Sequence, residues 1–331
     1  MKTELLPFTQ DMIPEASVLL AKCQQRNRRV FPFLPPRFER PNAAAKALES
    51  LLDEKTTSGY ATLRDGKLVA YLIGDYTVEP WGRCGWIRLP GTALADGESV
   101  ATLQDLYVLL GDDWVHNGVF IHHTYLSATD PEIVNAWFAL DFGKERIDAI
   151  LDLRKVEIQE IQIPSGIEIR RAVPGDNERL ADMSDIIFRE LAKAPYWHPT
   201  PPEVWGDLRE GWAELADDSA LNIWLAMKNQ NTLGMIGFWA QEERDADMLA
   251  TPKMAYLSVA ATREEARGRG IATALTWTGL AHCKQNGDEY CITNWISPNL
   301  AASRFWPRFG FKEVVYRLTK QINPMIAWTR E

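Results

Sequence analysis

The feature that most constrains the fold of this chain is a six-residue segment, residues 267–272, which reads Arg-Gly-Arg-Gly-Ile-Ala. It follows an apolar run at residues 254–260 that is typical of a buried strand, and it leads into a helix-forming run at residues 271–285. A strand, a glycine-containing turn and a helix start form an anion site, because unbonded backbone N–H groups converge there and the helix dipole favours negative charge.

The residue types in this turn suit a pyrophosphate-bearing cofactor. Gly268 and Gly270 allow close backbone approach and positive φ, while Arg267 and Arg269 can donate charge-assisted hydrogen bonds to phosphate oxygens. The segment matches neither the dinucleotide-binding G-x-G-x-x-G pattern at the start of a βαβ unit nor the P-loop pattern. A Gly-Arg-Gly turn can also simply open a helix, so the following residues decide between these interpretations.

The segment and the residues after it resemble the GNAT acetyltransferases. That family carries [Arg/Gln]-x-x-Gly-x-[Gly/Ala] after a strand, here Arg267, Gly270 and Ala272. A second strand is expected at residues 290–296, and the chain then continues Asn299-x-x-Ala302 and ends this region with Trp306-Pro-Arg-Phe-Gly-Phe311. The hexapeptide alone is a moderate signal. A turn that only opens a helix would not explain why the downstream residues also match the family in order.

The resemblance implies acetyl-CoA as the donor substrate. In this family the pantetheine arm lies between two splayed central strands, which here are residues 256–259 and 291–295, and backbone groups near Leu257 and Val259 would hold it. Asn299 and Trp306 would line the other side. The pyrophosphate would rest on the N–H groups of Gly268, Arg269, Gly270, Ile271, Ala272 and Thr273, with Arg267 beside them.

Two residues expected from the family's catalytic pattern are missing. The usual carboxylate early in the first splayed strand is replaced by Pro252-Lys-Met254, and Trp306 stands where many members have a proton-donating tyrosine. Nearby candidates are Glu242, Asp247, Tyr256 and Tyr290, and nothing in their spacing selects one. The catalytic acid and base therefore stay unassigned.

The acceptor pocket in this family is built by the first two helices and their connection. Here that region contains Trp197 and His198, which we identify as candidate acceptor contacts, together with Tyr196, Trp205 and Trp212. Aromatic residues at such spacing are as often part of a core, and a structural histidine is the more common role for His198.

The chain also contains two similar halves. In the second, helical periodicity at residues 177–193 and 202–216 precedes a hairpin at 222–240, and the first half has the same order. Trp137-x-x-Leu-Asp-Phe142 aligns with Trp306-x-x-Phe-Gly-Phe311, and Thr124 aligns with Thr293, at one offset. We therefore expect an α/β (α+β) fold of tandem GNAT domains, each a mostly antiparallel mixed sheet with a splayed central strand pair flanked by helices.

The predicted domains are residues 1–155 and 166–331. In the first, residues 90–97 occupy the position of the cofactor turn, between a strand and a helix expected at residues 98–110. They lack the Arg-x-x-Gly-x-Gly pattern and place Asp96 where a phosphate would lie. The first domain is thus expected to be degenerate, leaving one cofactor site per chain in the second.

The charge and the cysteine content of the chain limit the kinds of partner that it is expected to bind. The 331 residues carry a formal net charge of −9, which disfavours binding to nucleic acid or an anionic membrane. Four scattered cysteines without a CxxC pair suggest neither a zinc site nor a disulfide framework, so no metal is expected. The first residues lack the apolar core of a secretion signal, which favours a cytoplasmic protein, as a monomer or a homodimer.

The sequence therefore predicts an N-acetyltransferase that transfers the acetyl group of acetyl-CoA to the primary amine of a small molecule, by direct attack in a ternary complex. The alternative is an acetyl-CoA-binding sensor without turnover, which the missing tyrosine and carboxylate favour. A third possibility is an acyltransferase that uses a longer acyl-CoA.

Overall fold

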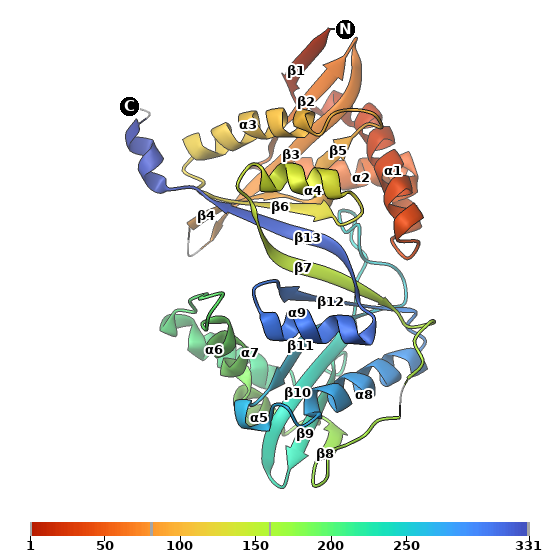
Figure 1. Cartoon of the computed structure of the whole chain (residues 1–331), viewed down its shortest axis with the longest axis vertical. Coiled ribbons are helices and arrows are strands. Elements are labelled where there is room, and N and C mark those ends of the chain that lie inside the picture. The colour runs from red at the N-terminus through yellow and green to blue at the C-terminus, as the bar shows by residue number, and fades with distance from the viewer. Residues whose placement is uncertain (1, 80–81, 159, 330–331) are drawn as a thin grey trace. The chain divides into compact units, whose positions relative to one another are not determined.

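The computed structural model describes residues 2–79, 82–158 and 160–329. The chain divides into two compact units, and each is discontinuous in sequence. The first unit contains residues 1–147, 243–251 and 313–331, and the second contains residues 148–242 and 252–312. The last strand of the chain and a short segment of the second half therefore belong to the first unit (Figure 1).

The first unit is built on a mixed sheet with the strand order β1-β2-β3-β4-β6-β13-β7. Neighbouring strands pair antiparallel from β1 to β4 and between β6 and β13, while β4 and β6 pair in parallel. The strands are β1 (Thr3–Pro7), β2 (Ser58–Arg64), β3 (Lys67–Glu79), β4 (Gly82–Ile87), β5 (Thr92–Leu94), β6 (Ile121–Ser127), β7 (Gly143–Asp152) and β13 (Lys312–Gln321). The short strand β5 pairs with β3 off this path.

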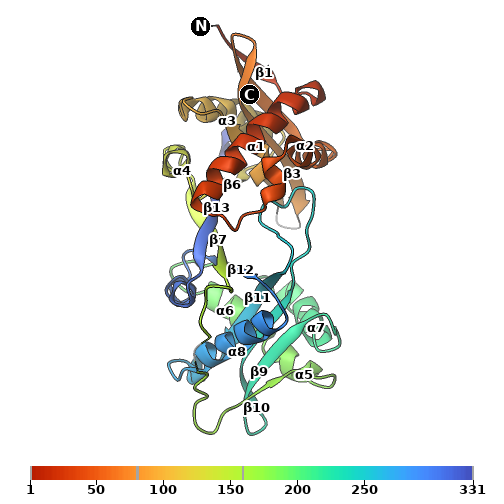
Figure 2. The ribbon, with the colours of Figure 1, turned by 90° about the vertical axis from the view of Figure 1, so that its right-hand side faces the viewer.

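Helices cover both faces of this sheet (Figure 2). Because side chains alternate along a strand, Tyr71 and Ile73 of β3 join one core with α1 (Ile13–Val30) and α2 (Pro41–Leu52). Ala70 and Leu72 join the opposite core with α3 (Ala101–His116) and α4 (Pro131–Phe138). The helix expected at residues 98–110 is thus present but begins and ends later.

The second unit has the strand order β7-β12-β11-β10-β9-β8, to which β7 contributes its last residues. β11 and β12 are parallel, and β8 to β11 pair antiparallel. The elements are β8 (Glu168–Arg171), α5 (Asn177–Ala181), α6 (Ser184–Leu191), α7 (Trp205–Glu214), β9 (Asn222–Lys228), β10 (Asn231–Ala240), β11 (Met254–Thr262), α8 (Ile271–Gln285), β12 (Tyr290–Ile296) and α9 (Leu300–Phe305).

The core of the second unit lies under its first three helices. Leu180, Met183 and Ile223 are among its buried members, with Met235 and Val259 from the central strands. The single helix expected at residues 177–193 is wrong: it is two helices, broken at Asp182, whose carbonyl accepts from Arg263 (3.3 Å) and whose carboxylate accepts from Arg209 (2.9 Å).

The predicted fold class is confirmed: each unit is a mostly antiparallel mixed sheet that contains a parallel pair and has flanking helices. Backbone geometry also matches between the halves, because Asp141 and Gly310, which align in sequence, both have positive φ (67° and 94°). The domain boundaries at residues 155 and 166 describe duplicated sequence halves, whereas the units are defined by contacts, so those boundaries remain a prediction.

Candidate active site

The two parallel strands of the second unit separate part-way along their length. Pairing between β11 and β12 ends at Leu257 and Thr293, although β11 continues to Thr262. The Thr293 hydroxyl donates to the Leu257 carbonyl (2.9 Å) at this point. On the other side of β11, Gly237 pairs with Val259 and Phe238 with Leu257, which leaves Ser258 as a bulge. A bulge bends its strand, and here it lies where β11 leaves β12.

A cavity of about 710 Å³ occupies the space that this separation opens. Its walls are residues 257, 258 and 260–262 of β11, residues 293–296 of β12, one side of α6, the glycine turn and residues of α9 and the turn after it. The cavity has the size of a site for a small-molecule ligand. It includes nine of the eleven residues expected at the cofactor: Leu257, Arg267, Gly268, Gly270, Ile271, Ala272, Thr273, Asn299 and Trp306.

The glycine turn has the backbone geometry that the sequence indicated. Gly268 and Gly270 have φ values of 74° and 81°, in the left-handed region that favours glycine. α8 begins at Ile271 with no acidic residue in its first turn, and its first intrahelical bond runs from the Ala274 N–H to the Gly270 carbonyl (2.9 Å). The amides of residues 271–273 precede that bond, so they point their N–H groups beyond the helix end.

Arg267 is held in place by an ion pair that the sequence did not reveal. Its guanidinium lies 3.0 Å from the Glu190 carboxylate of α6, which also lies 3.3 Å from the Lys193 ammonium. Burial by itself would raise the pKa of Glu190, but the hydrogen bond from Arg267 and the charges of Arg267 and Lys193 hold it below its ordinary value. Glu190 therefore stays ionised and orients Arg267 at the cavity.

Two further arginines near the cavity differ in whether they line it. Arg269 is exposed and is not among the lining residues, whereas Arg308, which follows Trp306, lines the wall. Arg308 lies inside the family-like segment of the sequence, but nothing in its spacing distinguished it from a solvated surface arginine.

Asn299 and Trp306 serve the local structure as well as the cavity. The Asn299 side chain caps α9 by accepting from the Ala302 N–H (3.2 Å), which satisfies one of the helix's free donors. Trp306 is buried and packs its ring against Phe305, Phe309 and Phe311, with centroids 4.9, 6.4 and 6.0 Å away. Both residues therefore have a structural reason to be present, independent of any ligand.

Two of the residues expected at the cofactor, Val259 and Arg269, are not among those that line the cavity. Val259 points its side chain into the core beneath α5–α7 instead, since residues alternate along the strand. Only the backbone of Val259 remains available to a ligand in the gap.

The candidate acceptor contacts are exposed. Trp197 has 68% of its surface accessible and a positive φ of 50°, and His198 stacks on Tyr196 with centroids 5.1 Å apart. Neither is among the residues that line the cavity. Both follow α6, whose last turn supplies Glu190 and Leu191 to the wall.

The four candidate acid–base residues lie in different surroundings. Asp247 accepts from the Leu249 and Ala250 N–H groups (2.9 and 3.0 Å) in a loop of the first unit, and Glu242 is exposed. Tyr290 lies under the Arg154 guanidinium, 4.6 Å from its ring centre. The Tyr256 hydroxyl accepts from the Asn294 amide (2.7 Å), and Asn294 lines the cavity. Among the lining residues that the structure describes, Glu190 is the acidic one, and none is His, Cys or Tyr.

The corresponding region of the first unit has a different course. β4 and β6 pair as far as Ile87 and Thr124, and the chain then forms β5, which returns to β3. Asp96 binds the Arg26 guanidinium (2.7 Å), and the Ser99 hydroxyl accepts from the Ala101 N–H (3.2 Å) at the start of α3.

Residues 185–311, which contain all the walls of the cavity, match the family model described as Acetyltransferase (GNAT) family. This match supports a GNAT domain in the second half of the chain. Members of this family generally use acetyl-CoA. Within the described residues, no helix is long and apolar enough to cross a membrane, and no group of three or more His, Cys, Asp or Glu side chains is arranged to hold a metal ion.

Curated proteins that are similar to this chain are named mycothiol acetyltransferases. The protein of Thermobispora bispora is 25% identical over 190 residues, which cover 55% of this chain and 61% of that protein. The protein of Rhodococcus erythropolis is 23% identical over 269 residues, 78% of this chain and 79% of that one. The first of these matches thus spans about three fifths of the relative's length.

Solved structures share the fold over nearly the whole chain. A GCN5-related N-acetyltransferase from Sphaerobacter thermophilus has a TM-score of 0.61 at 17% identity, covering 97% of this chain and 96% of its own. A tandem GNAT protein from the clavulanic acid biosynthesis pathway has a TM-score of 0.55 at 12% identity, covering 98% and 99%. The tandem GNAT fold predicted from the sequence is therefore confirmed.

Proposed function

We propose that this protein is an N-acetyltransferase that transfers the acetyl group of acetyl-CoA to the primary amine of a small molecule, at one site in the second unit. The observation that carries the proposal is the cavity that joins the gap between β11 and β12 to the glycine turn. An extended pantetheine arm with a pyrophosphate at its end needs this combination of a strand-lined slot and an anion site.

The pyrophosphate would accept hydrogen bonds from the amides between Gly268 and Thr273, next to the positive end of the α8 dipole. Arg267, oriented by Glu190, would add a charge-assisted bond, and Arg308, which also lines the cavity, would add a second. Arg269, being exposed, would act through its charge at longer range.

The pantetheine arm would lie along β11, whose backbone N–H and C=O groups are unpaired with β12 beyond Leu257. The backbone of residues 257–259 would polarise the thioester carbonyl, Asn299 would offer its amide N–H₂ group, and Trp306 would form an apolar wall. Trp197 and His198 remain the proposed acceptor contacts, because they continue the chain from the α6 wall.

In the reaction, the amine nitrogen attacks the thioester carbon, the C–N bond forms as the C–S bond breaks, and the amine loses a proton while the thiolate gains one. An amine with a pKa of about 10.4 is neutral in about one molecule in 2,500 at pH 7, so a proton must leave before attack. With no His, Cys or Tyr among the described lining residues, we propose that water carries this proton to solvent.

Magnitudes support catalysis of this kind. General acid–base groups contribute about 10²–10⁴-fold, whereas holding two reactants in line supplies about 7–11 kcal/mol of the barrier. Positioning is the larger contribution, so an active site without the family's usual tyrosine retains most of its rate enhancement.

Small-molecule acetylation is also the chemistry for which the curated relatives are named. The net charge of −9 argues against nucleic acid or an anionic membrane as partner. We also propose that the protein is cytoplasmic and acts as a monomer or a homodimer.

The alternative, a sensor that binds acetyl-CoA without turnover, is favoured by the same lack of acid–base groups in the described wall. The test is thiol release from acetyl-CoA by the purified chain, measured against a panel of primary amines and against hydrolysis without amine. We expect release above hydrolysis with at least one amine. Tight binding of acetyl-CoA with no amine-dependent release would support the sensor, and faster release from a longer acyl-CoA would change the donor.

A further inference from the structure

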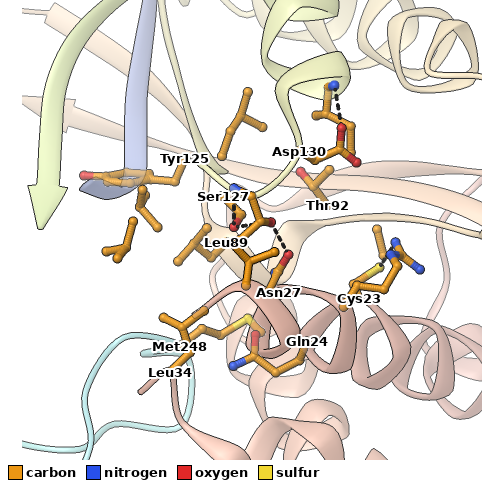
Figure 3. A pocket seen from close by; sticks show the side chains of 18 of the residues that line it. Cys23, Gln24, Asn27, Leu34, Leu89, Thr92, Tyr125, Ser127, Asp130 and Met248 are labelled. Carbon is orange, nitrogen blue, oxygen red and sulfur yellow. Dashed lines mark hydrogen bonds between the residues drawn. The ribbon is translucent and has the colours of Figure 1, made fainter. Parts of the chain in front are cut away.

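The first unit contains a second cavity, of about 350 Å³, that the proposed reaction does not use. It lies between α1, β5 and the end of β6, and the segment at residues 243–251 closes one side (Figure 3). Much of its wall is apolar, formed by Leu20, Leu34, Leu89, Leu126, Ile133 and Met248. Its volume is within the range of small-molecule sites.

One polar side chain in this wall has an unused acceptor. Gln24 of α1 is only 2% exposed, and its Nε2 donates to the Pro35 carbonyl (3.0 Å). That bond fixes the side-chain amide and leaves Oε1 without a protein donor among the described residues. Because Gln24 lines the cavity and this oxygen has no protein donor, it can accept a hydrogen bond from a ligand N–H group there.

Asn27 supplies the complementary group one turn along α1. Its Oδ1 accepts from the Thr129 hydroxyl (2.5 Å), which also lies 2.9 Å from the Ser127 hydroxyl. This arrangement leaves the N–H₂ group of Asn27 as a donor without an acceptor among the described residues. Residues three apart on a helix lie on one face, and Figure 3 shows Gln24 and Asn27 extending from α1 on the same side of the cavity.

The charged groups of the wall are already engaged or exposed. The Arg26 guanidinium lies 2.7 Å from the Asp96 carboxylate. Asp130 caps α4 by accepting from the Glu132 and Ile133 N–H groups (3.1 Å each), and Arg29 is exposed. A buried ionised ligand would therefore lack a counter-ion, and burying an unpaired charge is far more costly than burying an amide.

We propose that this cavity is a binding site for a small neutral secondary amide. The ligand's carbonyl oxygen accepts from the Asn27 amide, its N–H donates to Gln24 Oε1, and its apolar substituent packs against Leu34 and Met248. The site is separate from the proposed acetyl-CoA site and does not depend on it.

The test uses four probes of matched chain length on the full chain: N-butylacetamide, its N-methylated tertiary amide, butylammonium and pentanoate. Binding is followed by NMR of the ¹³C-labelled methionine methyl groups, with the Met248 signal assigned by Met248→Leu. N-butylacetamide should shift the Met248 signal with a dissociation constant of about 1 mM or lower. The tertiary amide, which cannot donate to Gln24, should bind about 2- to 10-fold more weakly, and both ions at least about tenfold more weakly.

Asn27→Asp tests the donor, because it keeps the acceptor for Thr129 and replaces the N–H₂ group by a charged oxygen. The order of probes should invert, with butylammonium binding more tightly than N-butylacetamide. Asn42→Asp, which adds the same charge at an exposed position of α2, should leave the order unchanged.

Equal binding of the four probes to the native chain would overturn the proposal, and so would a Met248 signal that N-butylacetamide does not shift at tens of millimolar. Retention of the native probe order in a folded Asn27→Asp chain would overturn the role of Asn27. If that variant does not fold, the relative affinities of the four probes for the native chain still test the site.

Discussion

The two units open the same strand pair at corresponding residues and then use the gap differently. In the first, β4 and β6 separate after Ile87 and Thr124, and in the second, β11 and β12 separate after Leu257 and Thr293. The first unit returns its chain to the sheet as β5, while the second proceeds through the glycine turn to α8. The anion site is therefore a property of one short connection and not of the shared sheet.

The helices that follow these two connections also differ in the groups that surround their N-termini. At α3 the Ser99 hydroxyl accepts from the Ala101 N–H, and Asp96 and Glu98 lie just before the helix, paired with Arg26 and Arg64. At α8 no side chain caps the helix and no acid lies in the first turn. Of these two described helix starts, the one at α8 therefore retains free N–H groups and a positive dipole end for a ligand.

The largest effect is expected for Gly270→Glu. It places bulk and negative charge at the phosphate turn and should weaken acetyl-CoA binding by more than about 100-fold, measured by calorimetric titration. The matched control is Gly97→Glu in the first unit, because Gly97 has nearly the same φ (80° against 81°) and open space around it. Equal affinity of the two variants would refute the assignment of the turn.

The units should also differ in their response to acid. His122 bonds Tyr107 and His123 stacks on Trp86 in the first unit, and burial lowers the pKa of each to about 4. In the unfolded chain they titrate near 6.5, so between pH 6.5 and 4 the unfolded state binds more protons and stability falls as pH falls. The loss is up to about 3 kcal/mol per histidine.

Hydrogen exchange at pH 7 and pH 5 measures this response for each unit. Amides in the core of the first unit should lose protection faster on acidification than those of the second, and His122→Leu should reduce the difference. Equal pH slopes in both units would contradict the role given to these histidines.

A smaller effect is expected for the arginines of the turn. Arg267→Gln removes a charge-assisted bond that Glu190 orients and should weaken acetyl-CoA binding about 10-fold. Arg269→Gln removes the same charge from a side chain that does not line the cavity and should cost less than about threefold. Calorimetry at two salt concentrations separates the two, and a larger loss for Arg269 would reverse their assigned roles.

The smallest effect is expected for Trp306→Tyr, which restores the residue common in the family. It adds a hydroxyl where the described wall has no His, Cys or Tyr, so turnover should rise about threefold with unchanged stability. Trp137→Tyr at the aligned, fully buried position of the first unit should leave turnover unchanged. A fall in turnover for a stable Trp306→Tyr chain would instead give Trp306 a packing role against the cofactor.

The sequence predicted the parts of this molecule that local chemistry determines. The turn at Gly268 and Gly270 could be predicted because positive φ and a helix start leave a signature in neighbouring residues. The boundaries of α8 and β12 followed from periodicity for the same reason.

What the sequence missed depends on residues far apart in the chain. The Glu190–Arg267 ion pair joins residues 77 positions apart, and the bulge at Ser258 depends on its pairing with β10. The assignment of residues 243–251 and 313–331 to the first unit is likewise a result of tertiary packing, for which no local pattern exists.

Whether the second unit alone retains an acetyl-CoA site can be measured by calorimetric titration of the full chain with acetyl-CoA, analysed for stoichiometry. We expect one site per chain with a dissociation constant of about 1 μM, or about −8 kcal/mol. Two sites per chain, or no binding at all, would contradict a single acetyl-CoA site in the second unit.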